Sequence, residues 1–180
     1  MIEMVIDSIR ASALKYERVV ILKEKTSDRY LPIWIGPAEA NAIAVKLQGL
    51  PVPRPLTQDL LCNIISSLNA ATSSIIINDL RDDTFYARII LEVQGRQLEI
   101  DARPSDALAL AIRTNAPIFA DESVLNKAGL LINDKTVKSA SVDGNTDNKE
   151  IVTEGEIEQL SVFADFINNL DLDDFEKHKS

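Results

Sequence analysis

The chain has 180 residues, of which 46% are apolar, and it carries a net charge of −9 with a single cysteine. This length and apolar fraction indicate one globular domain with an appendage, and a single cysteine excludes an intrachain disulfide and a metal site made of several thiolates. The N-terminus carries acids where a signal peptide carries bases, and no apolar run is long enough to span a membrane, so the cytoplasm is the expected location.

The acidity is concentrated in the last third of the chain. Residues 1–120 hold 13 Lys and Arg against 14 Asp and Glu, a net of −1, whereas residues 121–180 hold 6 against 14, a net of −8. All nine arginines lie in the first of these segments. A nearly neutral body removes the strongest argument against nucleic-acid binding, although it is not evidence for such binding.

Alternating and β-branched segments predict strands, and alanine-rich or periodic apolar segments predict helices. In chain order the expected strands are 3–9, 18–25, 30–35, 72–78, 85–93, 97–102 and 117–119. The expected helices are 37–47, 57–68, 104–113 and 122–127. This pattern predicts a mixed β-sheet with helices, in the α/β (α+β) class.

Five local features carry finer expectations. Pro32 interrupts a strand and indicates a sheet edge or a bulge. Residues 38–47 of the first expected helix are apolar nearly all round, so this helix is expected to be buried. Thr57 suits the N-cap of the next helix, Cys62 is interpreted as a small packing residue, and Trp34 is interpreted as core, with an oligomer contact as the alternative.

The domain organisation follows from a change in composition near residue 133. Residues 1–132 are expected to form the folded domain, residues 133–155 a polar linker, and residues 156–180 an acidic tail containing an amphipathic C-terminal helix. The apolar side of this helix could pack on its own body or on a neighbouring subunit. Alternatively, its acids could occlude a nucleic-acid site.

An internal repeat emerges when the sequence is shifted by 67 residues. Segment 37–46 then lies over segment 104–113, with all but one position identical or chemically close. Each segment follows a pair of expected strands, which predicts a duplicated strand–strand–helix unit. The shift also places Glu39 over Asp106, each in the first turn of a helix, where an acid is either a functional residue or a partner of the helix dipole.

Several carboxylates are expected at the second of these strand-to-helix turns. Glu99 and Asp101 are two residues apart on one strand, so both side chains point to the same face, and Asp106 follows just across the turn with Arg103 beside it. Clustered carboxylates suit Mg²⁺ or Mn²⁺, which can activate water against a phosphodiester. The alternative is a solvated strand face followed by a helix cap.

A second candidate site lies at the start of the helix expected at 57–68. Arg54 could contact phosphate, and Asp59 is either a ligand or catalytic acid or a partner of the helix dipole. Other kinds of chemistry lack the necessary residues. The only histidine is His178, the third residue from the C-terminal end of the sequence, so no Ser-His-Asp or Cys-His arrangement is expected in the body. The sequence also contains no glycine-rich phosphate loop.

Four segments have a specific residue order. They are Gly-Pro-Ala-Glu-Ala at 36–40, Arg-Pro-Leu-Thr-Gln-Asp-Leu-Leu at 54–61, Phe-Tyr-Ala at 85–87 and Ile-Asp-Ala-Arg-Pro-Ser-Asp-Ala at 100–107. In this order they resemble the bifunctional nuclease domain family. The resemblance implies a self-associating mixed α/β domain that cleaves DNA and RNA. It also implies that the site is formed by Glu39, Asp59, Asp101, Arg103 and Asp106.

One departure from the family pattern concerns residue 58. The family usually has Thr-His-Asp where this chain has Thr57-Gln58-Asp59, and an amide cannot take up a proton near neutral pH. The prediction is a metal-assisted nuclease that binds nucleic acid and forms a homo-oligomer without a membrane segment. Two alternatives remain open, namely a non-catalytic self-associating binding module and a hydrolase of small phosphorylated metabolites.

Overall fold

The computed structural model describes residues 1–11 and 18–131, which form eight strands and four helices. In chain order they are β1 Ile2–Ala11, β2 Arg18–Glu24, β3 Arg29–Ile35, α1 Pro37–Leu47, α2 Thr57–Ser67, β4 Ala70–Arg81, β5 Thr84–Val93, β6 Arg96–Ala102, α3 Pro104–Thr114, β7 Ile118–Ala120, α4 Glu122–Ala128 and β8 Leu130–Leu131. The expected linker and acidic tail lie outside the described residues. The predicted mixed sheet with helices is confirmed.

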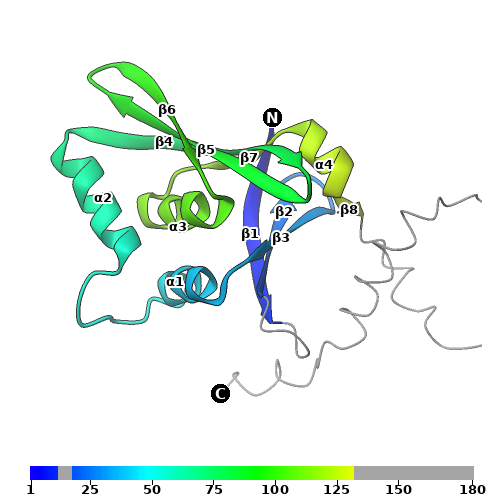
Figure 1. Ribbon diagram of the computed structural model, residues 1–180, viewed down its shortest axis with the longest axis horizontal. Helices are drawn as coiled ribbons and strands as arrows, with labels where there is room; N and C mark the ends of the chain where they lie inside the picture. Colours follow the sequence, from blue (N-terminus) through cyan, green and yellow to red (C-terminus); the bar gives the residue numbers. More distant parts are fainter. Residues whose placement is uncertain (12–17, 132–180) are drawn as a thin grey trace, which may run out of the picture.

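The strands form one mixed sheet with the order β6-β5-β4-β7-β1-β2-β3-β8. All neighbouring strands are antiparallel except β4 and β7, which are parallel. The sheet therefore consists of two antiparallel halves, β4–β6 and β1–β3, which the three-residue strand β7 joins (Figure 1). This short strand was expected at about the right place, and its role as the joint follows only from the topology.

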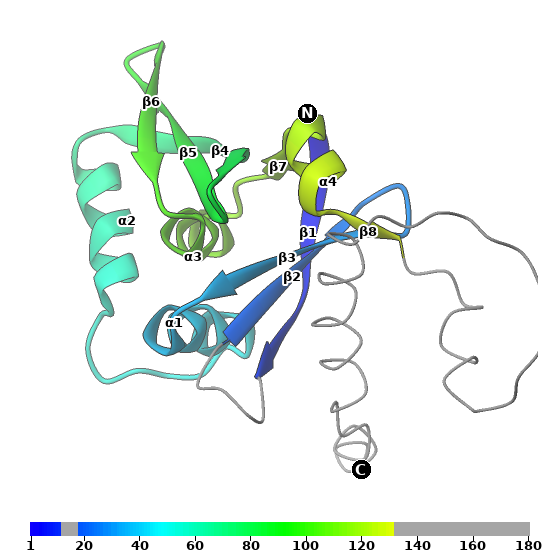
Figure 2. The same ribbon diagram turned by 45° about the vertical axis from the view of Figure 1, so that its right-hand side comes forward.

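Three helices lie together beside the sheet (Figure 2). The central helix is α3, which packs against β4 and β5 and has α1 on one side and α2 on the other. Its side chains Leu108 and Leu110 are fully buried, as are Ile75 and Ile77 of β4. Burying large aliphatic side chains is the main favourable term in folding, so α3 is the fixed element against which the other two helices are positioned.

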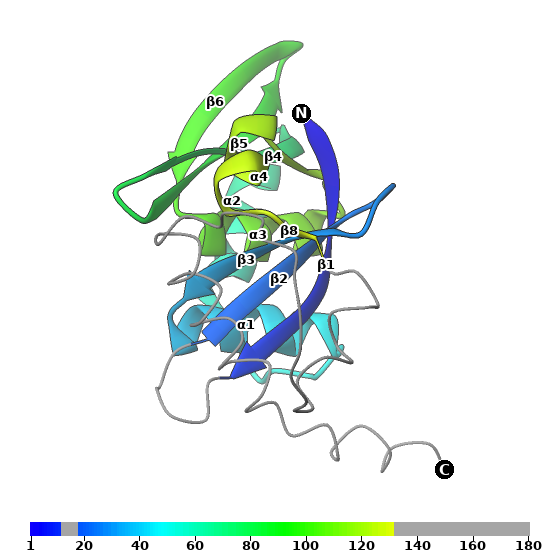
Figure 3. The same cartoon turned by 90° about the vertical axis from the view of Figure 1, so that its right-hand side faces the viewer.

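Two expectations about burial are wrong. The structure buries only Ala40, Ala42 and Ile43 of α1, because this helix lies at the side of α3 and against β2 (Figure 3), not beneath the centre of the sheet. Trp34 is 49% exposed, so it is not a core residue. Its neighbours Ile33 and Leu31, on alternate positions, are the buried ones, because side chains on a strand alternate between faces.

The two hairpins of the β4–β6 half turn in the gaps between the expected strands 72–78, 85–93 and 97–102. Asp82 and Asp83 have φ of 46° and 56°, and Gln94 and Gly95 have φ of 51° and 75°. Positive φ at both central residues matches the right-handed twist of two-residue hairpins, and it favours Asp, Asn and Gly. The order β2–β3–α1 recurs as β5–β6–α3, but this shared order does not confirm the predicted duplication.

Candidate functional site

The first turns of α1 and α3 are linked by Arg103, the N-cap residue of α3. Its guanidinium donates two hydrogen bonds to the Asp106 carboxylate, from Nε at 2.8 Å and from Nη2 at 3.2 Å, and one from Nη1 to Glu39 Oε1 at 2.9 Å. Both helices begin with proline, which suits the first helical position, and both carry their acid two residues later. We call Glu39, Arg103 and Asp106 the Arg103 cluster.

The Arg103 cluster is open to solvent. The Arg103 side chain is 65% exposed, against 35% for Asp106 and 21% for Glu39. Asp106 first, and Glu39 second, raise the pKa of the Arg103 guanidinium, so the arginine remains charged. With two carboxylates and one guanidinium the cluster has a formal charge of −1. Three of the five guanidinium N–H groups are used in these bonds, which leaves two for another acceptor.

The two acids expected on β6 lie apart from this cluster. Glu99 accepts a hydrogen bond from Arg88 Nη1 at 2.9 Å, and Asp101 lies directly across from Arg88 in the β5–β6 register. Arg88 therefore neutralises Glu99, and the face that also carries Asp101 keeps a formal charge of −1. Within residues 1–11 and 18–131 no group of three or more His, Cys, Asp or Glu side chains could hold a metal ion. The structure does not bring Glu99, Asp101 and Asp106 together as one ligand set.

The second candidate site is built around a buried arginine at the end of α3. The Arg113 side chain is only 4% exposed, and its Nε donates to Asp59 Oδ1 at 2.7 Å. Its two Nη atoms donate to the backbone carbonyls of Ala109, at 2.9 Å, and of Ala42, at 3.1 Å. One side chain therefore connects α3 to both α1 and α2, which fixes the positions of all three helices.

Asp59 also closes the start of α2. Its Oδ2 accepts a hydrogen bond from the Leu56 N–H at 2.8 Å, which satisfies one of the free donors at a helix N-terminus. The prediction that Thr57 is the N-cap residue of α2 is wrong. The N-cap residue is Leu56, and its backbone N–H is bound by the side chain of Asp59, the third residue of the helix. Arg113 above all, with help from the Leu56 N–H, lowers the pKa of Asp59 against the opposing effect of burial.

These roles bear on the catalytic assignment of Asp59. Both of its oxygens are engaged, and a carboxylate with a lowered pKa is a weaker general base than one near neutrality. The geometry thus favours the structural alternative, in which Asp59 supports the helix start and anchors Arg113. Gln58, which stands where the family usually has histidine, is half-buried beside it.

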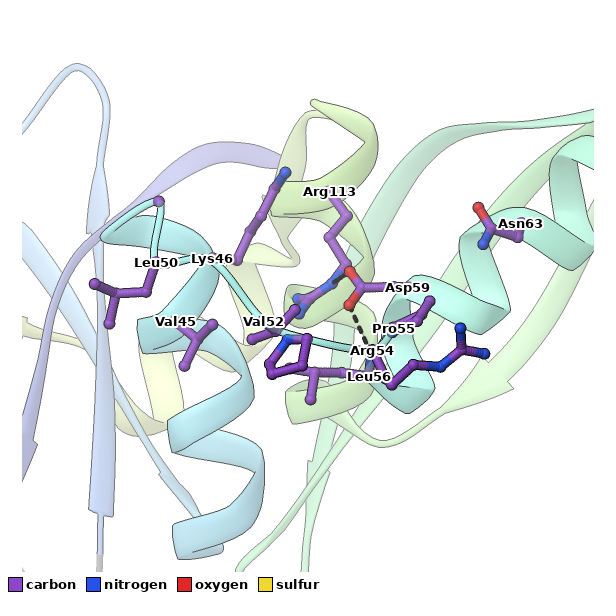
Figure 4. A pocket seen from close by; sticks show the side chains of 12 residues that line it. Val45, Lys46, Leu50, Val52, Arg54, Pro55, Leu56, Asp59, Asn63 and Arg113 are labelled. Carbon is purple, nitrogen blue, oxygen red and sulfur yellow. Dashed lines mark hydrogen bonds and ion pairs between the residues drawn. The ribbon is translucent and has the colours of Figure 1, made fainter.

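A cavity of about 410 Å³ opens above this ion pair (Figure 4). The loop 49–56 forms one wall, the last turn of α1 another, and the first turns of α2 the third. Lys46 and Arg54 lie at its rim and are exposed, while Arg113 lies inside. With Asp59 the formal charge of this cavity is +2, so the positive potential lies here and not at the Arg103 cluster.

The loop that forms the wall is set by the end of α1. Gly49 has φ of +64°, and the N–H groups of Gly49 and Leu50 donate to the carbonyls of Lys46 and Val45. This pair of bonds is the Schellman arrangement, which needs a left-handed residue and so favours glycine. The three prolines that follow, Pro51, Pro53 and Pro55, restrict the loop further.

Five of the seven predicted site residues fall into two groups at opposite ends of the α1–α3 pair, and the other two, Glu99 and Asp101, lie on β6. Arg103 and Arg113 are ten residues apart on α3, which corresponds to about 15 Å at 1.5 Å per helical residue. Glu39, Arg103 and Asp106 form the group at the helix starts, and Arg54 and Asp59 belong to the cavity. A single site containing all five residues is not observed.

Sequence reasoning missed Lys46 and Arg113 as site residues. The shift by 67 residues places Lys46 over Arg113, just as it places Glu39 over Asp106, and each of these pairs meets at one end of the α1–α3 pair. The internal repeat could therefore have pointed to Lys46 and Arg113. However, a repeat shows only which positions of the two helices are equivalent, and it does not show that the two helices lie side by side. Cys62 packs against the core and burial raises the pKa of its thiol, in agreement with a packing role.

The structure is an α+β domain with two charged sites, the Arg103 cluster with a formal charge of −1 and the cavity with a formal charge of +2. Residues 20–133 match the model of the bifunctional nuclease domain family, and the chain belongs to that family. An uncharacterized protein of Mycobacterium tuberculosis is 41% identical over 167 residues, which are 93% of each chain. A rice protein (Oryza sativa subsp. indica) named bifunctional nuclease 1 is 24% identical over 133 residues, or 72% of this chain and 40% of the rice protein.

No helix within the described ranges is long and apolar enough to cross a membrane.

Proposed function

We propose that this chain hydrolyses phosphodiester bonds of DNA, RNA or both, and that the reaction takes place at the Arg103 cluster. The observation that carries the proposal is the convergence of two carboxylates, from the first turns of two helices, on one exposed arginine. Membership of the bifunctional nuclease domain family supports nucleic acid as the substrate class. The rice relative, a named bifunctional nuclease, supports it at the level of distant homology.

Each residue of the cluster has a role in this proposal. The two unused N–H groups of Arg103 bind a non-bridging phosphate oxygen and stabilise the charge that develops on it. Glu39 accepts a proton from the attacking water, because only one of its oxygens is bonded to Arg103 and a carboxylate at hydrogen-bond distance can act as general base. Asp106 holds the Arg103 guanidinium through both of its oxygens. Both acids are held on helix starts, so their positions change little during the reaction.

A metal requirement fits this cluster only in part. Carboxylate oxygens are the ligands that Mg²⁺ and Mn²⁺ prefer. However, both cluster acids are paired with Arg103, and the described part of the chain contains no larger metal-binding group. The described arrangement therefore does not form a metal site, and no step of the proposed reaction depends on one. The dependence on Mg²⁺ or Mn²⁺ that the sequence predicts, with Asp101, Asp106 and Glu99 as ligands, is a separate proposal.

The test is cleavage of labelled RNA and of plasmid DNA by the purified full chain, with Mg²⁺, with Mn²⁺ and with EDTA. Loss of a general base lowers a rate by about 10²–10⁴-fold, so Glu39→Gln should lower cleavage by at least about 100-fold. Asp106→Asn should also lower cleavage, because Arg103 loses the charged partner that holds it in place. Asp83→Asn, in an exposed hairpin turn, is the matched control and should cleave as the wild type does. Equal cleavage by Asp106→Asn and the wild type would show that the activity comes from another site or another protein.

A second candidate function is a self-associating binding module without catalysis. The observation that favours it is the edge strand β6, which pairs only with β5 and has six of its seven residues exposed. Leu98 and Ile100 of this strand are 48% and 44% exposed on one face. An exposed edge with apolar side chains favours pairing with a further strand, and a second copy of β6 would extend the sheet into a homo-oligomer.

Sedimentation of the full chain tests this second candidate. Ile100→Lys places a charge in the expected contact and should shift a dimer to monomer, whereas Leu68→Lys, on an exposed position outside β6, should not. A wild-type chain that sediments as a monomer at all concentrations would exclude self-association through this edge. Self-association through the β6 edge is itself compatible with hydrolysis, because β6 and the Arg103 cluster do not share residues.

A further inference from the structure

The cavity at the C-terminal ends of α1 and α3 contains more positive charge than its internal ion pair needs. Arg113 is neutralised by Asp59, but Lys46 and Arg54 at the rim make no ion pair with any other described residue. Lys46 and Arg54 lie on either side of Arg113 (Figure 4), and both side chains are exposed, so both can turn toward a ligand in the cavity. A phosphate monoester carries about −1.5 to −2 at pH 7, whereas an internal phosphodiester carries −1, so the charge of the cavity matches a monoester.

The walls of the cavity are apolar. Val45, Leu50, Val52 and Leu56 line it together with the charged groups (Figure 4). Leu50 and Val52 are 52% and 40% exposed, which is a large apolar area for a loop surface. A ligand that places a phosphate at the rim cations and a flat, weakly polar group against these walls would remove this area from water. The volume of about 410 Å³ lies in the usual range for small-molecule sites.

We propose that this cavity binds a nucleoside phosphate monoester, with Lys46 and Arg54 as the phosphate ligands and the apolar wall as the surface for the base.

Buried interactions organise the cavity in advance. Arg113 is held by Asp59 and by two carbonyls, and Asp59 in turn holds the Leu56 N–H at the beginning of α2. Gly49 and the prolines fix the loop on the other side. Little chain motion has to be lost when a ligand binds, and this lowers the entropic cost of binding. Arg113 is thus a positioning residue rather than a direct ligand.

This site goes beyond the proposed nuclease function and does not rest on it. The cavity lies about 15 Å along α3 from the Arg103 cluster, and a mononucleotide contains no phosphodiester bond to cleave. The monoester can come from a free mononucleotide or from the phosphorylated end of a nucleic acid. Both sources present the same chemical group to Lys46 and Arg54, and the experiment separates them.

The experiment is calorimetric titration of the full chain, in EDTA, with 5′-AMP, 3′-AMP, adenosine and inorganic phosphate. At least one AMP should bind about tenfold or more tightly than adenosine, because one charge-assisted contact contributes about that factor. Lys46→Gln and Arg54→Gln should each weaken AMP binding about tenfold. Lys25→Gln, in the turn after β2, and Arg81→Gln, at the end of β4, each remove one positive charge from an exposed side chain and should bind as the wild type does.

A second titration uses a trinucleotide with and without a terminal phosphate. Tighter binding of the phosphorylated trinucleotide than of AMP would identify a nucleic-acid end as the ligand, and equal or weaker binding would identify the free nucleotide. The proposal is overturned if adenosine binds as tightly as AMP, if no phosphate-bearing probe binds, or if both rim variants bind AMP as the wild type does. If the chain binds AMP as expected but cleaves no nucleic acid, the proposed binding site is supported and only the proposed hydrolysis is refuted.

Discussion

The Asp59–Arg113 ion pair should contribute measurably to the stability of the domain. The change to make is Arg113→Met, which keeps the length of the side chain and removes the charge and all its donors. Arg113 is 4% exposed and contributes three hydrogen bonds, to Asp59 and to the carbonyls of Ala109 and Ala42. The variant leaves the Asp59 carboxylate without its cation beneath the cavity.

The size of the effect follows from burial. Removing one member of a fully buried ion pair costs about 3–5 kcal/mol, because the other charge stays desolvated. Asp59 is 31% exposed, so water replaces part of what Arg113 provided. We therefore expect Arg113→Met to lower the free energy of unfolding by about 2–3 kcal/mol, a discount on the fully buried value.

The assay is urea denaturation followed by circular dichroism at pH 7, as a double-mutant cycle with Asp59→Asn. Asparagine keeps an oxygen for the Leu56 N–H and removes the charge, so the cycle isolates the ion pair. We expect a coupling energy of about 1–2 kcal/mol, within the range found for residues in contact. A coupling energy below about 0.5 kcal/mol would refute the reasoning that this pair holds α2 to α3.

The pH dependence of stability tests the same ion pair independently. Arg113 lowers the pKa of Asp59 in the folded state, so the folded state binds a proton at Asp59 less readily than the unfolded chain does. The ion pair stabilises the fold at pH values above the pKa of Asp59 in the unfolded chain, which is about 3.9. This contribution is lost as the pH falls through the lower pKa that Asp59 has in the folded state. The stability difference between wild type and Arg113→Met should therefore shrink below about pH 4. A difference that grows with acidification would contradict the assigned cause.

Three further predictions concern other parts of the chain. Gly49→Ala should lower the free energy of unfolding by about 1–2 kcal/mol in the same urea assay, because φ is +64° there although a Cβ would meet no atom within 4 Å. Leu110→Ala, at a fully buried position, should lower the free energy of unfolding by about 2–5 kcal/mol. Leu68→Ala, at a position that is 67% exposed, should change it by less than about 0.5 kcal/mol, and similar values for the two variants would contradict the burial described. Deleting residues 150–180 should raise nucleic-acid affinity in an electrophoretic shift assay if the acidic segment occludes a site, and unchanged affinity would exclude that role.

The sequence predicted the elements well where local chemistry decides them. Pro32 indicated a sheet edge, and β3 does lie near the edge, with β8 paired only to Arg29 and Tyr30 on its outer side. The missing N–H of proline therefore costs no ladder bond there. The hairpin turns and the prolines that open α1 and α3 follow the same kind of local rule.

The burial of α1 and the division of the site could not be predicted in this way. An alanine-rich helix has the same composition whether it lies beneath a sheet or at its side, and only the packing of α3 on β4 and β5 decides which helix is covered. Likewise, five candidate residues can be read from the sequence, but their separation depends on the direction of α1 relative to α3. Arg113, which links the helices, has no local signature that distinguishes it from an ordinary basic residue in a last helical turn.

The three-residue strand β7 has a consequence for how the chain acquires its structure. Ile2 pairs with Ala120, and Met4 with Ile118, so the first strand receives its second neighbour from a segment more than 110 residues later. During synthesis the β1–β2–β3 hairpins can form early, but their inner edge stays uncovered until the chain has been made past residue 120. Such distant pairing slows folding and leaves a strand edge open to other chains in the meantime. The inner edge of β1 therefore stays open to pairing with other chains until β7 emerges from the ribosome.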